Sequence, residues 1–528
     1  MRETNAMFDA NEVRSVADIT RYRARVEGDK TAQVFGGRRT TYAELDSYSN
    51  RVAQGLIAEG CKPDSRIGYI GKSSDLYFEV LYGAFKAKAV MVGVNWRLAA
   101  PEIAYVLNDS RTEILFVGAE YYDIVEKVLS ECPNIRKVIA LDGGRTDWIS
   151  FSEWRDSFPD EDPMLPTDID DDVIQLYTSG TTGHPKGVQL TNRNYLAVFD
   201  QGMKSGWADW REEDVVLVCM PLFHVAGVNI GILGHLHGCT NVVLKDVDPA
   251  VILQLIEKEG ITVLFIVPAV ILFLLQQPNI AEVDVSSVRQ LLYGASPIAE
   301  DVLRNAQDRF KADFVQLYGL TETTGGATHL PPHAHDPAKN KLRSCGIPNP
   351  GTEIRIVDEN GKDVEPGGVG EVLIKGGSVM KGYWNRPEAT RESIVDGWFH
   401  SGDAGFFDED GYLYIHDRVK DMIVSGGENI YPAEVENALF GHPAIADAAV
   451  VGVPHEKWGE AVQAIVVLKP GETAEAADIV AFAKTRIAGY KVPKSIDFVE
   501  ALPRNPSGKI LRRELRKPYW EGRARMVN

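Results

Sequence analysis

Strand-like and helix-like segments alternate along much of residues 40–320, and no other feature of the sequence constrains the fold as strongly. In one unit Asp248 can cap a helix, Pro249 suits its first position and Gly260 can end it. The β-branched run 261–267 then follows as a buried strand. Strands that alternate with helices are typical of an α/β fold, so a large α/β region is predicted here.

Two further segments of this region carry clear signals. The strand 290–293 precedes a turn at 294–295, and Ser296-Pro297 is expected to open the next helix. The most apolar stretch, 264–275, contains a proline and is shorter than the ~20 residues that a membrane span needs. We therefore expect a buried strand and a helix there, and no transmembrane segment in the chain.

The pattern changes after residue 345, where short strands and turn residues follow one another. The runs 353–357 and 370–375 lie on either side of Asn360-Gly361, which favours a tight turn. Further turn signals follow at 396–397 and 410–411. This spacing predicts a small antiparallel β-barrel attached to the α/β region.

The end of the chain again mixes helices and strands. A helix is expected to open at Pro432. Two strand-like runs and a second helix follow, at 448–453, 461–468 and 474–487. This much chain suffices for a separate domain. We therefore predict an N-terminal domain over 1–417 and a small α+β domain over 418–528.

Length, charge and cysteine usage narrow the range of functions. The chain has 528 residues, and one hydrophobic core stops growing at roughly 250–300 residues, so at least two domains are expected. Its net charge of −19 disfavours nucleic acid and anionic membrane surfaces as partners. The cysteines form no CxxC pair and the N-terminus has no apolar run. These features predict buried, reduced cysteines, no signal peptide and a cytoplasmic location.

A loop rich in glycine, serine and threonine follows a predicted strand at 173–177, and 191–192 can cap the helix beyond it. Glycines let backbone N–H groups approach phosphate oxygens, hydroxyls add donors and a lysine adds positive charge. The loop is not a Walker A motif, because His184 and Pro185 separate the last glycine from the lysine. The residues predicted to hold phosphate are Thr178, Ser179, Gly180, Thr181, Thr182, Gly183 and Lys186.

The stretch 177–187 resembles the signature of the adenylate-forming superfamily, which includes acyl- and aryl-CoA synthetases, peptide-synthetase adenylation domains and beetle luciferases. Four more motifs are similar to those of the superfamily and stand in the same order, at 318–323, 397–403, 417–421 and 503–510. The resemblance runs from Thr41 to Arg516 and is closest to bacterial fatty-acid–CoA and aryl-acid–CoA ligases. It implies a large N-terminal domain, a mobile C-terminal domain and an ATP-dependent reaction.

The same resemblance implies roles for single residues around the nucleotide. Tyr318 would stack on adenine, and Glu322 with Thr181 would hold Mg²⁺ on the ATP phosphates. An aromatic ring offers a flat apolar face, and Mg²⁺ prefers hard oxygen ligands. Asp403 and Arg418 would contact the ribose hydroxyls. The other implied nucleotide contacts are Gly294, Ala295, Ser296, Gly319 and Thr321.

The resemblance also implies that the C-terminal domain turns about a hinge at Lys420 and adopts two poses. A different motif would enter the active site in each pose. One pose would bring Lys509 to the α-phosphate, where a positioned cation stabilises developing charge. The other would bring Gly426 and Gly427 to the wall of a pantetheine tunnel, which a Cβ atom would narrow. With Glu322 and His224, Lys509 completes the predicted catalytic set.

The acid pocket is expected around a short set of small residues. The predicted lining residues are His224, Gly227, Ala295, Gly325 and Gly326. His224 could gate the pocket, hold the carboxylate, or be a buried histidine with its hydrogen bonds satisfied. No charged residue is evident in these segments, so a hydrophobic acid is expected. The predicted substrate is a medium- or long-chain fatty acid, and an aryl or alicyclic acid is the alternative.

The predicted function is therefore an ATP-dependent acid–CoA ligase that uses ATP, Mg²⁺ and coenzyme A. An acyl-AMP ligase that loads a carrier protein is an alternative acceptor chemistry. A luciferase-like oxygenase and a non-catalytic nucleotide-binding regulator are alternatives of other classes. A homodimer is an expectation from the superfamily.

Replacing the predicted catalytic lysine should separate the two half-reactions. We expect Lys509→Ala to reduce adenylation at least ~100-fold, because a cation in a dry site contributes several kcal/mol to transition-state stabilisation. Thioester formation from supplied acyl-AMP should survive. Pyrophosphate release and acyl-CoA formation, measured separately, test this, and loss of both steps in a folded variant would contradict the two poses.

The matched variant for the second pose is Gly427→Trp, which should leave adenylation intact and block thioester formation. Normal acyl-CoA production by this variant would show that Gly427 does not line the tunnel.

Overall fold

The computed structural model describes residues 12–143, 145, 147–178, 185–418, 421–425, 428–455, 458–504 and 510–521.

Two large sheets form most of the N-terminal part. The first is parallel at its centre and antiparallel at both edges. Its order is β16 (Ile347–Pro348), β15 (Thr328–Leu330), β14 (Asp313–Tyr318), β13 (Gln290–Gly294), β12 (Val263–Ile266), β10 (Val215–Val218), β11 (Thr240–Val243), β1 (Thr31–Phe35) and β2 (Arg38–Thr41).

The second sheet is also parallel through most of its width, with antiparallel strands at one edge. Its order is β19 (Gly382–Tyr383), β9 (Lys186–Thr191), β8 (Asp172–Thr178), β4 (Val90–Gly93), β3 (Arg66–Ile70), β5 (Ile114–Val117), β6 (Lys137–Ala140) and β7 (Ile149–Ser150). Parallel neighbours joined by helices confirm the predicted α/β class.

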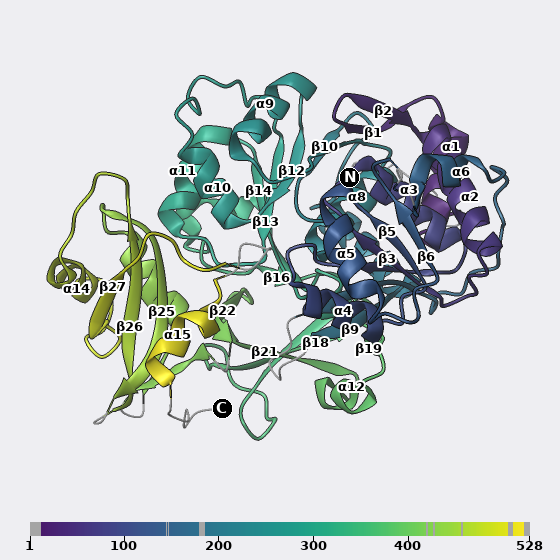
Figure 1. Cartoon of the computed structure of the whole chain (residues 1–528). Coiled ribbons are helices and arrows are strands. Elements are labelled where there is room, and N and C mark those ends of the chain that lie inside the picture. Colours follow the sequence, from purple (N-terminus) through teal and green to yellow (C-terminus); the bar gives the residue numbers. More distant parts are fainter. Residues whose placement is uncertain are drawn as a thin grey trace.

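Helices cover both sheets, as Figure 1 shows. One extended core cluster includes residues from strands of both sheets, so the two sheets share an interior. In this part the helices are α1 (Asp18–Glu27), α2 (Tyr42–Ala58), α3 (Asp75–Lys86), α4 (Ala100–Asp109), α5 (Tyr122–Leu129), α6 (Phe151–Asp156), α7 (Asn192–Ser205), α8 (Val225–Leu236), α9 (Pro249–Glu259), α10 (Pro268–Leu275), α11 (Glu300–Phe310) and α12 (Pro387–Ser393). Single 3₁₀ turns lie at η1 (Ala119–Tyr121), η2 (Thr321–Thr323), η3 (Pro332–His335) and η4 (Pro337–Lys339).

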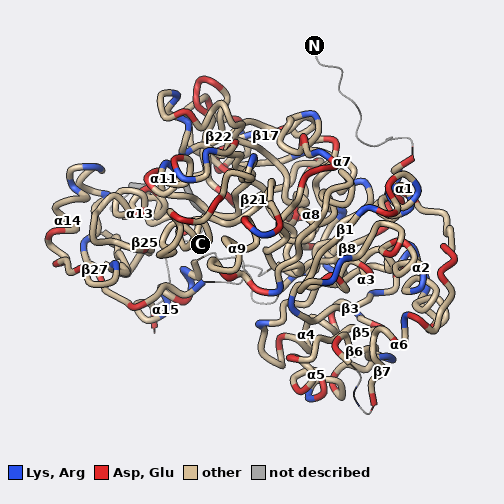
Figure 2. The backbone as a smooth tube through the Cα atoms, turned by 90° about the horizontal axis from the view of Figure 1, so that it is seen from above, with Lys and Arg blue, Asp and Glu red and all other residues tan. Residues whose placement is uncertain are grey.

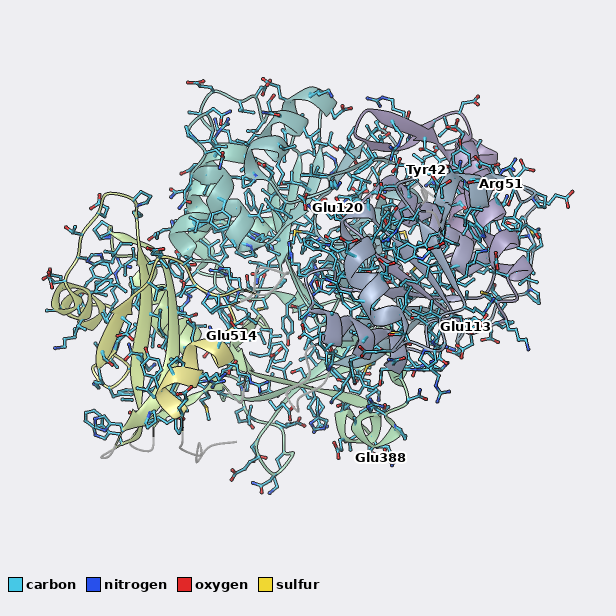
Figure 3. All side chains as sticks on the ribbon, in the orientation of Figure 1. Tyr42, Arg51, Glu113, Glu120, Glu388 and Glu514 are labelled. Carbon is cyan, nitrogen blue, oxygen red and sulfur yellow. The ribbon has the colours of Figure 1, made fainter. Side chains whose placement is uncertain are left out.

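A buried hydrogen bond connects the first helices to the first sheet. The hydroxyl of Tyr42, which is labelled in Figure 3, donates to the Cys239 carbonyl at 2.6 Å and so ties α2 to the loop before β11.

The local signals read from the sequence mostly set these boundaries. The Asp248 carboxylate accepts the N–H groups of the first turn of α9, and Gly260 ends that helix at φ 66°. The predicted buried strand and the helix after it are β12 and α10. The predicted start of the next helix at 296–297 is wrong, because α11 begins at Glu300. Ala295 adopts φ 68°, which reverses the chain and leaves an irregular turn before the helix.

Between residues 352 and 418 the strands pair antiparallel, as predicted. Their order is β17 (Thr352–Val357), β18 (Gly370–Gly376), β21 (Trp398–Phe407) and β20 (Ile394–Val395), with β22 (Leu413–Arg418) pairing with β21. No hydrogen-bonded pair among the described residues joins the outer strands β17 and β20, so these strands form a branched sheet.

The C-terminal part has its own apolar interior, formed by residues between Ile423 and Val492. Its sheet runs β24 (Glu428–Ile430), β23 (Ile423–Ser425), β26 (Gly459–Leu468) and β25 (Ile445–His455), with β27 (Ser495–Phe498) pairing with β26. Its helices are α13 (Pro432–Phe440), α14 (Ala476–Lys484) and α15 (Arg512–Trp520). Figure 1 shows this part beside the rest of the molecule, on the side of α11. The separate interior agrees with a small α+β unit, while the boundary at 417/418 stays a prediction.

Charge is not segregated along the chain. In Figure 2 acidic and basic residues are interspersed along the backbone in both parts of the molecule. All five cysteines are free and buried. Within the described residues no helix combines the length and apolar character that crossing a membrane requires.

Buried histidines make the fold sensitive to acid. Burial lowers the pKa of His235 to about 3 and those of His224, His237 and His335 to about 4. The unfolded chain titrates its histidines near 6.5, so it binds more protons than the folded chain between pH 6.5 and 4. Stability from these four groups is therefore lost as pH falls through that window. Glu79, whose pKa burial raises to about 7, acts in the opposite direction but is a single group.

We expect the thermal midpoint to fall steadily from pH 6.5 to 4, measured by circular dichroism. A His235→Gln variant removes one of the titrating groups and should show a shallower fall over the same window. An unchanged midpoint across that window in the native protein would contradict the neutral, buried state of these rings.

Candidate active site

The predicted nucleotide-binding residues lie at the carboxyl ends of neighbouring strands. Tyr318 is the last residue of β14, Gly294 of β13, and Thr178 of β8 in the other sheet. Carboxyl ends of parallel strands meet at one edge of a sheet, where α/β proteins bind ligands. The strand order therefore gathers Gly294 and Tyr318 at that edge, and the hydrogen bond from Thr178 to Glu322 brings the end of β8 beside them.

Tyr318 and Asp403 form a direct pair. The Tyr318 hydroxyl donates to the Asp403 Oδ2 atom at 2.7 Å. Burial and the adjacent Asp403 carboxylate raise the pKa of the Tyr318 phenol, so it stays protonated and remains a donor. Asp403 lies in β21 directly opposite Arg418 of β22. The two predicted ribose contacts are thus cross-strand neighbours, and the predicted adenine contact touches one of them.

Glu322 stands at the centre of a second cluster. It lies in η2 and is 9% exposed. Its Oε1 atom accepts the Tyr383 hydroxyl at 2.9 Å and the Thr178 hydroxyl at 3.4 Å. The Lys186 ammonium lies 4.6 Å from the centroid of the Tyr383 ring. One tyrosine therefore joins the predicted metal-binding carboxylate to the predicted phosphate-binding lysine.

Sequence reasoning did not single out Tyr383. It belongs to the short strand β19, which pairs with β9 in the register Tyr383 to Val188. Nearly two hundred residues separate the two strands, and neither pattern nor spacing links them. The phosphate loop itself joins β8 to β9 as an antiparallel pair, and α7 begins only after β9, where Thr191 caps it.

The loop after β13 is held under backbone strain. A Cβ atom on Gly294 would lie 2.2 Å from the Leu317 carbonyl oxygen, so only glycine permits this approach to β14. Ala295 has φ 68°, a conformation that costs a non-glycine residue roughly 1 kcal/mol or more. Such strain is common at ligand-binding sites. Ser296 follows in the same turn.

The turn after β14 packs closely on itself. A Cβ atom on Gly319 would lie 2.5 Å from the Gly325 carbonyl carbon. Thr321 opens η2 between these two glycines. The Thr324 backbone is left-handed, at φ 52°. Gly319 and the segment Gly325-Gly326 therefore pack together and form one wall.

That wall borders an apolar pocket. The lining residues are Val198, Trp207, Val225, Ala226, Asn229, Ile230, Leu233, Phe265, Ala295, Leu317, Gly319, Gly325 and Gly326. Ala295, Gly325 and Gly326 thus lie where the sequence places the acid pocket. Ala295 and Gly319 also belong to the predicted nucleotide set, so the pocket adjoins that set directly.

Two predicted lining residues lie elsewhere. Gly227 faces the main chain, since a Cβ atom there would lie 2.3 Å from the Pro221 carbonyl oxygen. His224 precedes α8 and is half-buried beside the pocket without lining it. Burial and the Arg97 cation lower the His224 pKa to about 4, so the ring is neutral at pH 7. Its Nε2 atom has no partner among the described residues, so it is buried but not fully hydrogen-bonded.

The remaining predicted site residues lie outside the described residues. They are Ser179, Gly180, Thr181, Thr182, Gly183, Lys420, Gly426, Gly427 and Lys509. The residues on either side of the last segment, Arg504 and Ile510, pair as an antiparallel bridge. Two basic residues of α15 are engaged within the C-terminal part, Arg512 with Glu436 and Arg516 with Asp421.

Comparison with known proteins places the chain in a family. Residues 20–384 match the model of the AMP-binding enzymes, and residues 434–509 match the model of the AMP-binding enzyme C-terminal domain. The chain belongs to the AMP-binding enzyme family. This confirms the resemblance to adenylate-forming enzymes, and the chain is an AMP-forming acid–thiol ligase.

Among members of the AMP-binding family, two curated relatives are similar over nearly their whole length. The fatty acid–acyl-carrier-protein ligase ScoC of Streptomyces coeruleorubidus is 42% identical over 98% of this chain and 99% of its own. A feruloyl-CoA synthase of an Amycolatopsis species is 41% identical over 94% and 97%. Among solved structures, the anthranilate CoA ligase AuaEII with anthranoyl-AMP has a TM-score of 0.89 at 26% identity, covering 96% of this chain and 97% of that one.

The hydroxyl of Tyr383 should matter for phosphate and metal handling. We expect Tyr383→Phe to lower kcat/KM for ATP about tenfold and to raise the Mg²⁺ concentration needed for half-maximal rate, because Glu322 loses a donor that orients it. Pyrophosphate release across a Mg²⁺ titration measures both. The control is Tyr490→Phe, which removes a hydroxyl from an exposed tyrosine. Equal behaviour of the two variants would contradict an orienting role for Tyr383.

Proposed function

We propose that this AMP-forming ligase joins a hydrophobic carboxylic acid to coenzyme A through an acyl-adenylate. In the first step a carboxylate oxygen attacks the α-phosphorus of ATP, and the bond to pyrophosphate breaks. In the second step the CoA thiol loses its proton and attacks the acyl carbonyl, and AMP leaves. The observation that carries the proposal is that one apolar pocket shares Ala295 and Gly319 with the nucleotide-binding loops.

The described residues suit the first step. The Tyr318–Asp403 pair offers a ring face for adenine and a carboxylate that can accept from ribose hydroxyls. Lys186 supplies positive charge beside the loop that would hold the phosphates. Lys509 is proposed to stabilise the charge that spreads over the α-phosphate. The His224 ring is neutral, so toward a carboxylate it can act only as a neutral hydrogen-bond donor.

The site also fits Mg²⁺ bound together with ATP. Among the described residues no three His, Cys, Asp or Glu side chains gather as a metal site. Mg²⁺ commonly keeps one or two protein carboxylates and takes its other oxygens from phosphates and water. Glu322 supplies the carboxylate, with Thr178 beside it and Thr181 as the proposed hydroxyl ligand. When bound, the ion would neutralise charge on the phosphates.

Coenzyme A is the proposed acceptor, and a carrier protein is the second candidate. The feruloyl-CoA synthase and the anthranilate CoA ligase support the first by their names. The acyl-carrier-protein ligase, 42% identical over 98% of the chain, supports the second. Either acceptor carries a thiol on a pantetheine arm, so Gly426 and Gly427 are proposed to border that arm in both cases.

The proposal extends to the cellular location and the oligomeric state of the protein. Five free, buried cysteines suit a reducing compartment, which supports a cytoplasmic location. A homodimer is proposed from the family alone.

Pyrophosphate release measured with and without CoA tests the proposal. A panel of short to long fatty acids, cinnamates, benzoates and alicyclic acids is offered with ATP and Mg²⁺. We expect one group of acids to give release that rises with CoA, together with acyl-CoA. EDTA should abolish it. Release without acyl-CoA would overturn CoA as the acceptor in favour of a carrier protein, and no release with any acid would overturn the ligase.

A further inference from the structure

Side chains of α4 reach both ends of the predicted phosphate loop. The hydroxyl of Tyr177, in the strand before the loop, donates to the Asp109 Oδ2 atom at 2.8 Å. The carbonyl oxygen of Pro185, directly before Lys186, accepts the Tyr105 hydroxyl at 3.0 Å. Tyr105 and Asp109 are four residues apart in α4 and so lie on one face of the helix. That face therefore contacts both stems of the loop, Tyr177 and Pro185.

Arg386 connects these two contacts. Its Nη2 atom donates to the Asp109 Oδ1 atom at 2.6 Å and to the Tyr105 hydroxyl oxygen at 3.2 Å. The Asp109 carboxylate thus accepts Tyr177 on one oxygen and Arg386 on the other. The Asp109 side chain is only 8% exposed, and a buried charge needs a partner of opposite sign. Through Asp109 and Tyr105, one arginine is linked to both stems.

Trp384 adds two further links between the same segments. Its backbone N–H donates to the Gly187 carbonyl in β9 at 2.8 Å. Its indole Nε1–H donates to the Asp109 carbonyl at 2.9 Å. The Arg66 guanidinium lies 3.5 Å from the centroid of the Trp384 ring, a contact that favours one ring position. The segment 383–386 is therefore anchored to β9 and to α4 at once.

The same segment also reaches the proposed ATP site. Tyr383 donates its hydroxyl to Glu322, and its ring lies beside the Lys186 ammonium. The Arg386 backbone N–H donates to the Tyr383 carbonyl at 3.1 Å. A displacement of Arg386 would therefore reach the loop stems through Asp109 and the predicted metal-binding carboxylate through Tyr383.

Fixed stems matter because of the composition of the loop. A chain rich in glycine can adopt many conformations, so the positions of its two ends limit which ones it can take. Holding the ends in place lowers the ordering cost when a ligand binds. Burial and the adjacent Asp109 carboxylate raise the pKa of the Tyr177 phenol, so this hydroxyl stays protonated and remains a donor to Asp109.

We propose that Asp109 and Arg386 are positioning residues of the adenylation step, which hold the two ends of the phosphate loop where the β- and γ-phosphates of ATP require them. This inference rests on the proposed function, in which that loop binds the phosphates. It also defines where the effect ends. Acyl-AMP carries no β- or γ-phosphate, so the second half-reaction should not depend on this network.

The test breaks the network at its most exposed member and measures the two half-reactions separately. The Arg386 side chain is 41% exposed, so Arg386→Ala opens no cavity in the core. We expect this variant to raise KM for ATP and to lower kcat/KM for pyrophosphate release roughly ten- to hundredfold, because small displacements of binding groups have effects of this size. KM for the acid should stay at its native value. Thioester formation from supplied acyl-AMP should also stay native, with CoA as acceptor, or holo-acyl-carrier protein where CoA gives no turnover.

Two variants separate positioning from the loss of an ion pair as such. Arg386→Lys keeps a positive charge beside Asp109 and should recover part of the lost kcat/KM for ATP. Arg39→Ala is the matched control, because it breaks a pair with Glu259 that has a similar length of 2.7 Å and similar exposures of 57% and 11%. That pair joins β2 to α9, so its loss should leave both half-reactions native.

A third variant removes one stem contact alone. Tyr177→Phe deletes the hydroxyl that donates to Asp109 and should slow pyrophosphate release without changing thioester formation. If both residues act through Asp109, the losses from Tyr177→Phe and Arg386→Ala should combine less than additively in free energy. Full additivity would overturn Asp109 as the common link.

The outcomes distinguish this inference from the function it rests on. An unchanged KM for ATP in Arg386→Ala, or an equal loss in both half-reactions, would overturn the positioning role and leave the ligase standing. Equal behaviour of Arg386→Ala and Arg39→Ala would overturn it as well. Absence of pyrophosphate release by the native enzyme with every acid would overturn the ligase itself. Should Arg386→Ala not fold, Tyr177→Phe provides the same comparison with the loss of a single hydroxyl.

Discussion

The close pairing of β13 with β14 is the constraint on which the site depends. Gly294 lies so near the Leu317 carbonyl that no side chain fits between the two strands. The next residue, Ala295, adopts a left-handed conformation at the bend that follows β13. The turn then borders both Tyr318 at the end of β14 and the apolar pocket. The proposed sites for nucleotide and acid are therefore adjacent because these two strand backbones are in close contact.

Around that turn, tyrosine hydroxyls hold carboxylates in position. Tyr318 donates to Asp403 and Tyr383 donates to Glu322. Burial raises the pKa of the Tyr318 phenol, so its proton stays on the donor side of the bond. These hydroxyls occupy the oxygens that we propose for ribose and a metal ion when ATP binds. The carboxylates are thus oriented before the ligand arrives, which lowers the ordering cost of binding.

The acid side of the site follows a different physical rule. Its lining is almost wholly apolar, so affinity there comes from surface burial and shape. The neutral, half-buried His224 adds no charge to the pocket.

The sequence by itself determined the α/β class, the limits of α9 and the antiparallel strands between residues 352 and 418, and it predicted the loops at which ligands are proposed to bind. These depend on local chemistry, since Asp248 caps and Gly260 ends a helix whatever lies around it. Family motifs added roles for Tyr318, Glu322 and Asp403 without showing that these residues touch one another. Only the tertiary structure decided that Tyr383 reaches Glu322, that Gly227 faces the main chain, and that Asp109 joins Tyr177 to Arg386. Those facts depend on strand pairing and packing between segments far apart in the chain, and no local pattern encodes such distances.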